Sequence, residues 1–209
     1  DTVILTFWVT GIVFVAVNLF LAWVVLKYRH RKDLKATYDP ENKKLEWWLT
    51  IVTSIGVAAM LAPGLFVWGK FVIVPKDAAI VEVVGQQWHW SFRFPGKDNE
   101  LGHSDAALVT PENPFGLDSE DPKGRDDVLV ASPELHLPVD QPVKVLLRSK
   151  DVLHNFTVTQ FRVKMDLVPG MITYLWLTPT KPGEYEILCE ELCGVGHFAM
   201  RGRVVVTPR

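Results

Sequence analysis

The amino-acid sequence predicts a two-helix transmembrane hairpin followed by an all-β domain, built as a Greek-key sandwich or barrel. Two long runs without a charged side chain, Thr2–Leu26 and Trp47–Gly69, predict the hairpin. At about 1.5 Å per residue, either run is long enough to cross roughly 30 Å of hydrocarbon. Short β-branched runs bounded by proline and glycine predict the β domain in the remainder of the chain. We therefore assign residues 1–70 to the hairpin and residues 71–209 to the β domain.

The first apolar run has a second interpretation, because a secretory signal peptide is also apolar. Its apolar part is longer than the roughly 7 to 15 residues of a signal core, and no small-residue cleavage site follows it. A membrane-spanning helix is therefore the favoured interpretation for both runs.

The segment between the two runs, residues 27–46, contains more basic than acidic side chains. A short loop with this excess stays on the cytoplasmic side of a membrane. We therefore expect an integral membrane protein of the bacterial cytoplasmic membrane, with both termini and the β domain on the periplasmic side. The loop carries Lys27, Arg29, Arg31, Lys32, Lys35, Lys43 and Lys44, set against Asp33, Asp39, Glu41 and Glu46.

Short apolar runs with turn residues between them continue to the end of the chain. Pro-Gly pairs, for example Pro169-Gly170 and Pro182-Gly183, separate several of these runs. Many short strands with such turn signals favour an antiparallel sandwich or a Greek-key barrel. The expected strands are residues 71–74, 79–84, 87–94, 134–137, 143–148, 156–159, 172–177, 184–188 and 203–206.

The stretch from Lys97 to Asp127 differs from the rest of the β domain because it has few apolar residues and many carboxylates. We expect an exposed acidic excursion. It is either an ordinary solvated loop or an acidic rim that attracts a cationic protein partner. The exported region shows no nucleic-acid-binding signature.

Two cysteines, Cys189 and Cys193, are the only ones in the chain, and their neighbours point to a metal. The following residues include His197 and Met200, and His154 lies at the start of an earlier strand. Copper in a redox site favours thiolate, imidazole and thioether ligands together. A disulfide would need no histidine or methionine nearby, zinc usually takes a different cysteine spacing, and the haem-attachment motif C-x-x-C-H is absent. Two cysteines would allow both thiolates to bridge two coppers.

The pattern Cys189-x-Glu191-x-Cys193-x-x-x-His197-x-x-Met200 resembles the binuclear CuA loop of cytochrome c oxidase subunit II. Three other segments resemble the same family in the same order: Gln87–Phe92, Ser149–His154 and Lys164–Gly170. With the two amino-terminal helices, the resemblance covers nearly the whole chain. It implies a cupredoxin-like β domain and a binuclear copper centre.

The resemblance also implies a ligand set. Cys189 and Cys193 would bridge two copper ions, with His154 and Met200 completing one copper, and His197 and the backbone carbonyl of Glu191 completing the other. The Glu191 carboxylate would help to bind Mg²⁺ at the boundary with the catalytic subunit, since Mg²⁺ prefers oxygen ligands.

Four further residues acquire roles from the same resemblance. Trp88 would be the exposed aromatic through which electrons arrive, whereas Trp90 fits a packed position in the sandwich. Glu46 would lie at the mouth of a proton path, although a carboxylate at a helix amino terminus is also favourable by itself. Lys164 and Asp166 match a segment near the magnesium and proton-exit region.

We therefore expect the electron-accepting subunit of a respiratory haem-copper oxidase. A soluble donor such as cytochrome c would deliver single electrons, which pass to haem in a catalytic membrane subunit that reduces oxygen to water and translocates protons. The chain itself would hold no haem, and its partners would be the donor, the other membrane subunits and membrane lipid, but not nucleic acid.

The alternatives are the CuA subunit of a nitrogen-oxide reductase and an assembly protein that carries copper. A quinol oxidase subunit would lack the copper ligands. Residues His89 and Lys150 depart from the commoner family pattern, which leaves the donor open.

Overall fold

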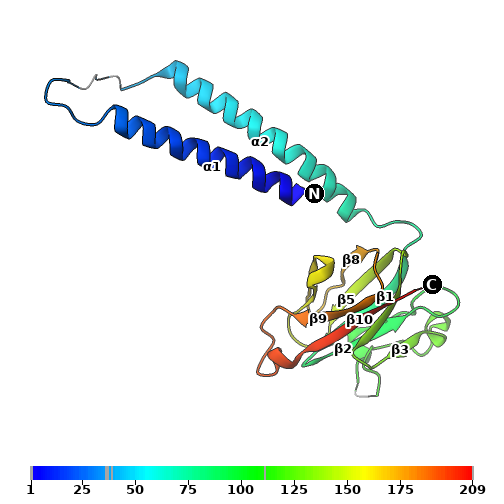
Figure 1. Ribbon diagram of the computed structural model, residues 1–209. Coiled ribbons are helices and arrows are strands. Elements are labelled where there is room, and N and C mark those ends of the chain that lie inside the picture. The colour runs from blue at the N-terminus through cyan, green and yellow to red at the C-terminus, as the bar shows by residue number, and fades with distance from the viewer. Residues whose placement is uncertain (1, 36–37, 39, 111, 209) are drawn as a thin grey trace. The chain divides into compact units, whose positions relative to one another are not determined.

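The computed structural model describes residues 2–35, 38, 40–110 and 112–208. The chain divides into two compact units, Asp1–Lys70 and Phe71–Arg209, and the second contains all the strands (Figure 1). Asp39, one of the acidic residues counted in the cytoplasmic loop, lies outside the described residues.

The first unit contains helix α1 (Thr2–Lys27) and most of helix α2 (Lys43–Val72). Both helices are long and apolar enough to cross a membrane. Helix α2 begins earlier than predicted because the Asn42 side chain accepts a hydrogen bond from the Leu45 N–H at 3.1 Å, which is the usual role of an N-cap residue.

Helix α2 also ends later than predicted, so the strand expected at residues 71–74 is wrong. The helix continues through Val72, and the connection to the β domain begins at Ile73. Once a helix is formed, each added residue gains a backbone hydrogen bond at little extra cost. That gain outweighs the β preference of Phe71 and Val72.

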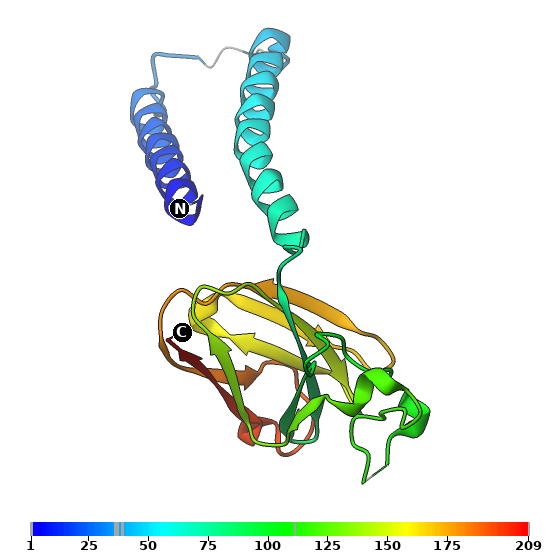
Figure 2. The same ribbon diagram turned by 90° about the vertical axis from the view of Figure 1, so that its right-hand side faces the viewer.

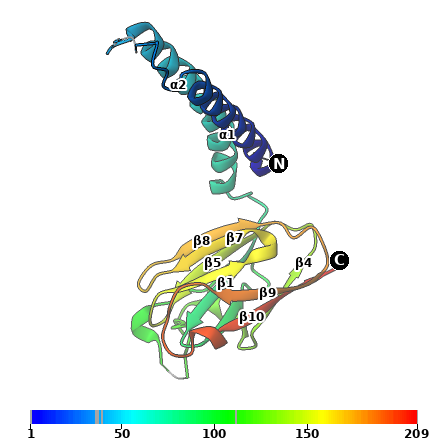
Figure 3. The same cartoon turned by 60° about the vertical axis from the view of Figure 1, so that its left-hand side comes forward.

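The second unit is a sandwich of two five-stranded sheets, which confirms the predicted cupredoxin-like class (Figures 2 and 3). The first sheet has the order β3-β2-β1-β5-β8, and the second has the order β4-β10-β9-β6-β7. The strands are β1 (Ala79–Gln86), β2 (His89–Phe94), β3 (Val128–Val130), β4 (Glu134–Pro138), β5 (Val143–Ser149), β6 (His154–Val158), β7 (Val163–Leu167), β8 (Thr173–Leu177), β9 (Gly183–Cys189) and β10 (Arg201–Thr207).

Most strand pairs are antiparallel, as expected, but each sheet also contains one parallel pair. Strand β1 pairs in parallel with β5, and β4 pairs in parallel with β10. Each of these pairs joins strands that are far apart in sequence, so no tight hairpin forces them to run in opposite directions. Strands β3 and β7 were not among the expected strands. The first has only three residues, and the second, Val163–Leu167, alternates apolar and polar side chains over only five positions.

The core lies between the two sheets and extends to the cysteines. Trp90 and Phe156 come from opposite sheets and meet edge to face, with ring centroids 5.9 Å apart. Cys189, Cys193 and Met200 belong to the same buried cluster as these aromatic rings. The candidate copper ligands are therefore held by the packing of the core itself.

The acidic excursion is only partly exposed, which corrects the prediction for residues 97–127. Figure 2 shows it in green at the outside of the sandwich. Arg93 of β2 donates to Glu82 of β1 at 2.7 Å and to Asp127 at 3.1 Å, and these side chains are at most 3% exposed. Phe115 of the excursion is also buried. Charged groups on the outer face of the first sheet therefore hold the excursion against it.

Replacing Arg93 with leucine should destabilise the β domain strongly. The variant would leave the Asp127 carboxylate buried without its cation and Glu82 with Arg148 alone, and breaking such a buried pair costs about 3–5 kcal/mol. The free energy of unfolding of the purified full chain, measured by urea titration, tests this. Arg201→Leu is the matched control, because the Arg201–Glu186 pair is exposed and worth at most about 1 kcal/mol. Equal losses in the two variants would contradict the role of the buried network.

Candidate metal centre

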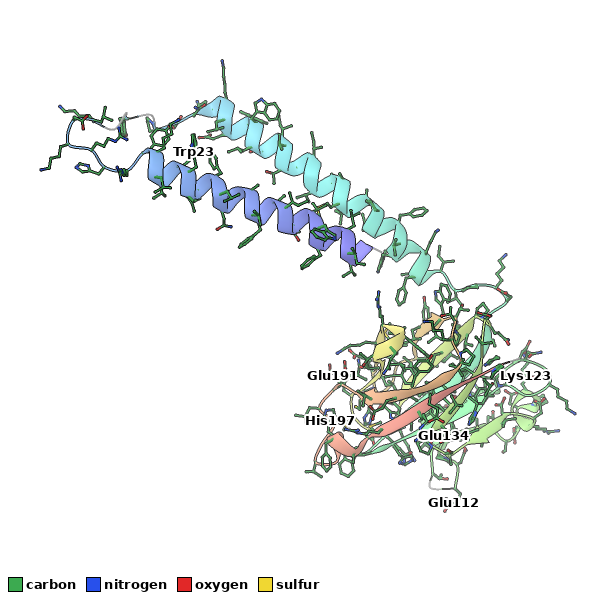
Figure 4. All side chains as sticks on the ribbon, viewed as in Figure 1. Trp23, Glu112, Lys123, Glu134, Glu191 and His197 are labelled. Atoms are coloured by element: carbon green, nitrogen blue, oxygen red, sulfur yellow. The ribbon has the colours of Figure 1, made fainter. Side chains whose placement is uncertain are left out.

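One loop joins β9 to β10 and carries five of the six predicted ligands. Cys189 is the last residue of β9, His197 begins the short 3₁₀ helix His197–Ala199, and Met200 directly precedes β10. Figure 4 shows Glu191 and His197 on this loop. His154, the sixth predicted ligand, is the first residue of β6, which pairs with β9. Strand pairing therefore brings the two parts of the site together.

The sulfur and imidazole ligand atoms lie at one place. The Sγ atoms of Cys189 and Cys193 are 3.8 Å apart, and both cysteines are free. Nδ1 of His154 lies 3.9 Å from Sγ of Cys189, and Nδ1 of His197 lies 3.5 Å from Sγ of Cys193. The two imidazoles therefore approach different cysteines, one beside each sulfur atom.

The remaining two predicted ligands complete the same cluster. Sδ of Met200 lies 3.9 Å from Sγ of Cys193, and the backbone carbonyl oxygen of Glu191 lies 3.3 Å from Sγ of Cys189. The set comprises two thiols, two imidazoles, a thioether and a carbonyl. Soft sulfur with imidazole fits copper, whereas Mg²⁺ and Ca²⁺ prefer oxygen. The residues present thus fit the copper centre that the sequence predicts.

The site is largely closed to water. His154 and Met200 are at most 1% exposed, and Cys193 is 3% exposed. Burial, together with the neighbouring Cys189 thiol, raises the pKa of Cys193 to about 11. Without a metal this thiol therefore keeps its proton at neutral pH, and a metal that binds as a thiolate complex must displace it.

Asp151 orients the His154 ring, a contact that the sequence analysis did not identify. Its Oδ1 lies 2.8 Å from Nε2 of His154, so that Nδ1 faces the sulfur atoms. Burial raises the pKa of the Asp151 carboxyl, but hydrogen bonds from the Gln87 N–H and the His154 ring outweigh it and hold the pKa below its usual range. A carboxylate on the far nitrogen is the usual partner of a metal-binding histidine. In the sequence, the only sign of this contact was the position of Asp151, three residues before His154.

Trp88 lies on the backbone of the ligand loop and is half-buried, which corrects the expectation of an exposed ring. Its Nε1 donates to the Cys193 carbonyl oxygen at 3.2 Å, and the Gln87 side chain donates to the same oxygen at 2.7 Å. A Cβ atom on Gly196 would come within 2.3 Å of the Trp88 ring. The ring can approach the loop this closely only because a glycine lies beneath it. Trp90, by contrast, is fully buried as predicted.

The other predicted site residues are Glu46, Lys164, Asp166 and the side chain of Glu191. Glu46 is in the first turn of α2, in the other unit of the chain. Lys164 pairs with Glu190 at 3.4 Å, and Asp166 accepts a hydrogen bond from buried Asn155 at 2.5 Å. Among the described residues, no hydrogen bond or ion pair involves the Glu191 carboxylate.

The chain is similar to known proteins over nearly its whole length. Residues 79–207 match the model of the family "Cytochrome C oxidase subunit II, periplasmic domain". The alternative cytochrome c oxidase subunit 2 of Bradyrhizobium diazoefficiens is 58% identical over 206 residues, which cover 99% of this chain and 74% of that protein. The chain belongs to the cytochrome c oxidase subunit II family.

Two further relatives are more distant. The cytochrome c oxidase subunit 2 of Cereibacter sphaeroides is 29% identical over 88% of this chain, which spans 63% of that protein. Among solved structures, the periplasmic domain of subunit II of cytochrome oxidase from Bradyrhizobium japonicum is 26% identical, covers 65% of this chain and 88% of its own, and has a TM-score of 0.47. Membership of the family implies a CuA copper centre. With its two candidate spans, the chain is a membrane protein whose β domain lies on the outer side.

Replacing Gly196 with alanine should displace the Trp88 ring. The new methyl group would overlap the ring, and overpacking of this kind costs about 1–3 kcal/mol. Thermal unfolding of the full chain and its near-ultraviolet circular dichroism would show the loss of stability and the altered tryptophan environment. Gly124→Ala is the control, because a Cβ atom there meets its nearest neighbour at an ordinary 3.4 Å. A Gly196→Ala variant that matches this control in both measurements would disprove the contact.

Proposed function

We propose that this chain is the electron-accepting subunit of a respiratory haem-copper oxidase. In this role it takes single electrons from a soluble donor such as cytochrome c and passes them to haem in a separate catalytic subunit. That subunit reduces oxygen to water and translocates protons. The observation that carries the proposal is the convergence of two thiols, two imidazoles, a thioether and a carbonyl in one buried site.

The proposed ligands divide between two copper ions. Cys189 and Cys193 would be shared by both ions, His154 and Met200 would complete the ligands of one, and His197 and the Glu191 carbonyl would complete those of the other. A pair of coppers bridged in this way supplies a one-electron carrier when bound. The chain contributes a rigid and dry environment: the ligands are packed into the sandwich core, and Asp151 fixes the His154 ring. A site that is packed into the core and largely closed to water requires little reorganisation when its charge changes.

Trp88 is the proposed point at which electrons arrive. Its indole N–H donates a hydrogen bond to the backbone carbonyl of Cys193, and Cys193 is itself a proposed copper ligand. A single hydrogen bond therefore connects the ring to a ligand residue. The part of the ring that remains exposed is available to a docked donor. The acidic residues of the excursion would attract a cationic donor and increase the rate of encounter.

Three more roles are proposed on the same basis. The Glu191 carboxylate, for which the described residues provide no partner, would bind Mg²⁺ together with the catalytic subunit. Lys164 and Asp166 would lie near this magnesium and the proton exit. Glu46 would stand at the mouth of a proton path, on the cytoplasmic side of the bacterial membrane, with both termini on the periplasmic side.

Two alternatives make different predictions about the copper. A copper-carrying assembly protein would hold exchangeable, mononuclear copper, whereas the relay needs a tightly held pair. The CuA subunit of a nitrogen-oxide reductase would have the same copper pair, but its partner subunit would not reduce oxygen. The presence of all six donors argues against a quinol oxidase subunit, which would lack them.

Electron paramagnetic resonance of the copper-loaded full chain tests the proposal directly. We expect the hyperfine pattern of one electron shared equally by two coppers. Cys193→Ser should abolish this signal because it removes a bridge. Met200→Leu should keep the shared-electron pattern and change only the reduction potential, and it serves as the matched control. A mononuclear copper spectrum for the unaltered chain would overturn the proposal.

Replacing Trp88 with phenylalanine should slow electron uptake several-fold without changing the copper centre. Phenylalanine keeps an aromatic ring but cannot donate to the Cys193 carbonyl. The measurement is the rate of oxidation of a reduced soluble cytochrome c by the assembled oxidase, with the resonance spectrum recorded on the same sample. An unchanged rate would show that electrons reach the copper by another route.

A further inference from the structure

Strand β8 forms one edge of the first sheet (Figure 3). Leu175 points into the core and is 2% exposed. Its two neighbours, Tyr174 and Trp176, therefore lie on the opposite face, because side chains alternate along a strand. The turn that precedes this strand adds Met171 and Ile172, which are 58% and 60% exposed. This edge of the β domain is thus unusually apolar for a surface.

A hydrogen bond fixes the depth of this edge relative to the membrane. Nε1 of Trp176 donates to the backbone carbonyl of Phe71 at 2.6 Å, within the last turn of α2. The uncharged part of α2 ends at Gly69, two residues earlier, and is just long enough for a hydrocarbon core of about 30 Å. Phe71 therefore lies in the headgroup layer, and the Trp176 indole bonded to it must lie there as well.

The outer face of β8 has an apolar groove and a nearby lysine, two features that suit the headgroup layer of a membrane. Phe71, Val72, Ile172 and Tyr174 line an apolar groove of about 360 Å³. Lys144, the cross-strand neighbour of Trp176, places its Nζ 5.1 Å from the centre of the Tyr174 ring. Tryptophan and tyrosine are enriched at the membrane interface, and lysines there attract anionic lipid phosphates.

We propose that the outer face of β8, with the turn before it, binds phospholipid of the outer leaflet. The apolar groove takes the upper acyl chain or glycerol region, and Lys144 faces the phosphate. This contact would hold the β domain at a constant height above the bilayer. The proposal requires only that α2 spans the membrane, so it is independent of the proposed copper chemistry.

Photo-crosslinking of the full chain in its own membrane tests the proposal. A benzophenone amino acid replaces Tyr174, which is 41% exposed, and the control site is Leu129, which is 47% exposed on β3 at the other edge of the same sheet. We expect the chain to gain the mass of one phospholipid at position 174 and none at position 129. A crosslink from position 174 to another protein chain, an equal lipid yield at position 129, or no crosslink to lipid would overturn it. Should the Tyr174 variant fail to fold, Ile172 offers a second exposed position on the face.

Charge provides a separate test in lipid nanodiscs. The yield of the lipid adduct at position 174 is compared between phosphatidylglycerol and phosphatidylcholine. Lys144→Gln should reduce the preference for the anionic lipid about fivefold, which corresponds to about 1 kcal/mol for one lysine near an anionic surface. Lys123→Gln is the control, since Lys123 pairs with Glu100 on the acidic excursion. If Lys144→Gln leaves the preference unchanged, the phosphate contact is refuted.

Discussion

The candidate copper centre depends on the position of β9 between β6 and β10. Phe156 of β6 lies opposite Cys189, and Leu188 lies opposite Arg201 of β10. This register places His154, two residues before Phe156, beside the first cysteine, and the loop between β9 and β10 brings Cys193 within 3.9 Å of the Met200 sulfur. Backbone hydrogen bonds of a sheet are rigid and numerous, so the donor atoms are positioned before any metal arrives. A shift of one residue in either pairing would turn the ligands to the opposite face.

The surroundings of the cluster extend this rigidity to its outer side. Trp88 can lie against the loop because Gly196 has no side chain, and the carbonyl of Cys193 accepts hydrogen bonds from both Gln87 and Trp88. Asp151 is bonded to the Gln87 N–H as well as to His154. The aromatic ring, the loop and the histidine are therefore fixed to one another through the β1–β2 turn.

Buried charges have a different role on the first sheet. Glu82, Arg93 and Asp127 would be costly to bury singly, but each compensates another, and Arg148 of β5 adds a second cation 3.1 Å from Glu82. The network makes the excursion part of the folded domain, although its composition resembles that of a solvated loop. Arg148 lies near the end of β5 and also donates a hydrogen bond to the Phe115 carbonyl of the excursion. Asp151, which contacts His154, follows three residues later. The end of β5 therefore holds both the excursion and the His154 ring in place.

The sequence by itself determined the two membrane helices, the β class, the ligand loop and the family resemblance. Each of these depends on composition or on spacing within a short segment, such as the three residues that separate Cys189 from Cys193. Only the tertiary structure decided the parallel pairs β1–β5 and β4–β10, the burial of Asp127, the contact of Asp151 with His154 and the bond of Trp176 to Phe71. These features join residues that lie far apart in the chain or depend on which way a side chain points, and neither property is carried by a local pattern. The end of α2 shows the converse, since the local β preference of Phe71 and Val72 gave way to the continuing hydrogen bonds of the helix.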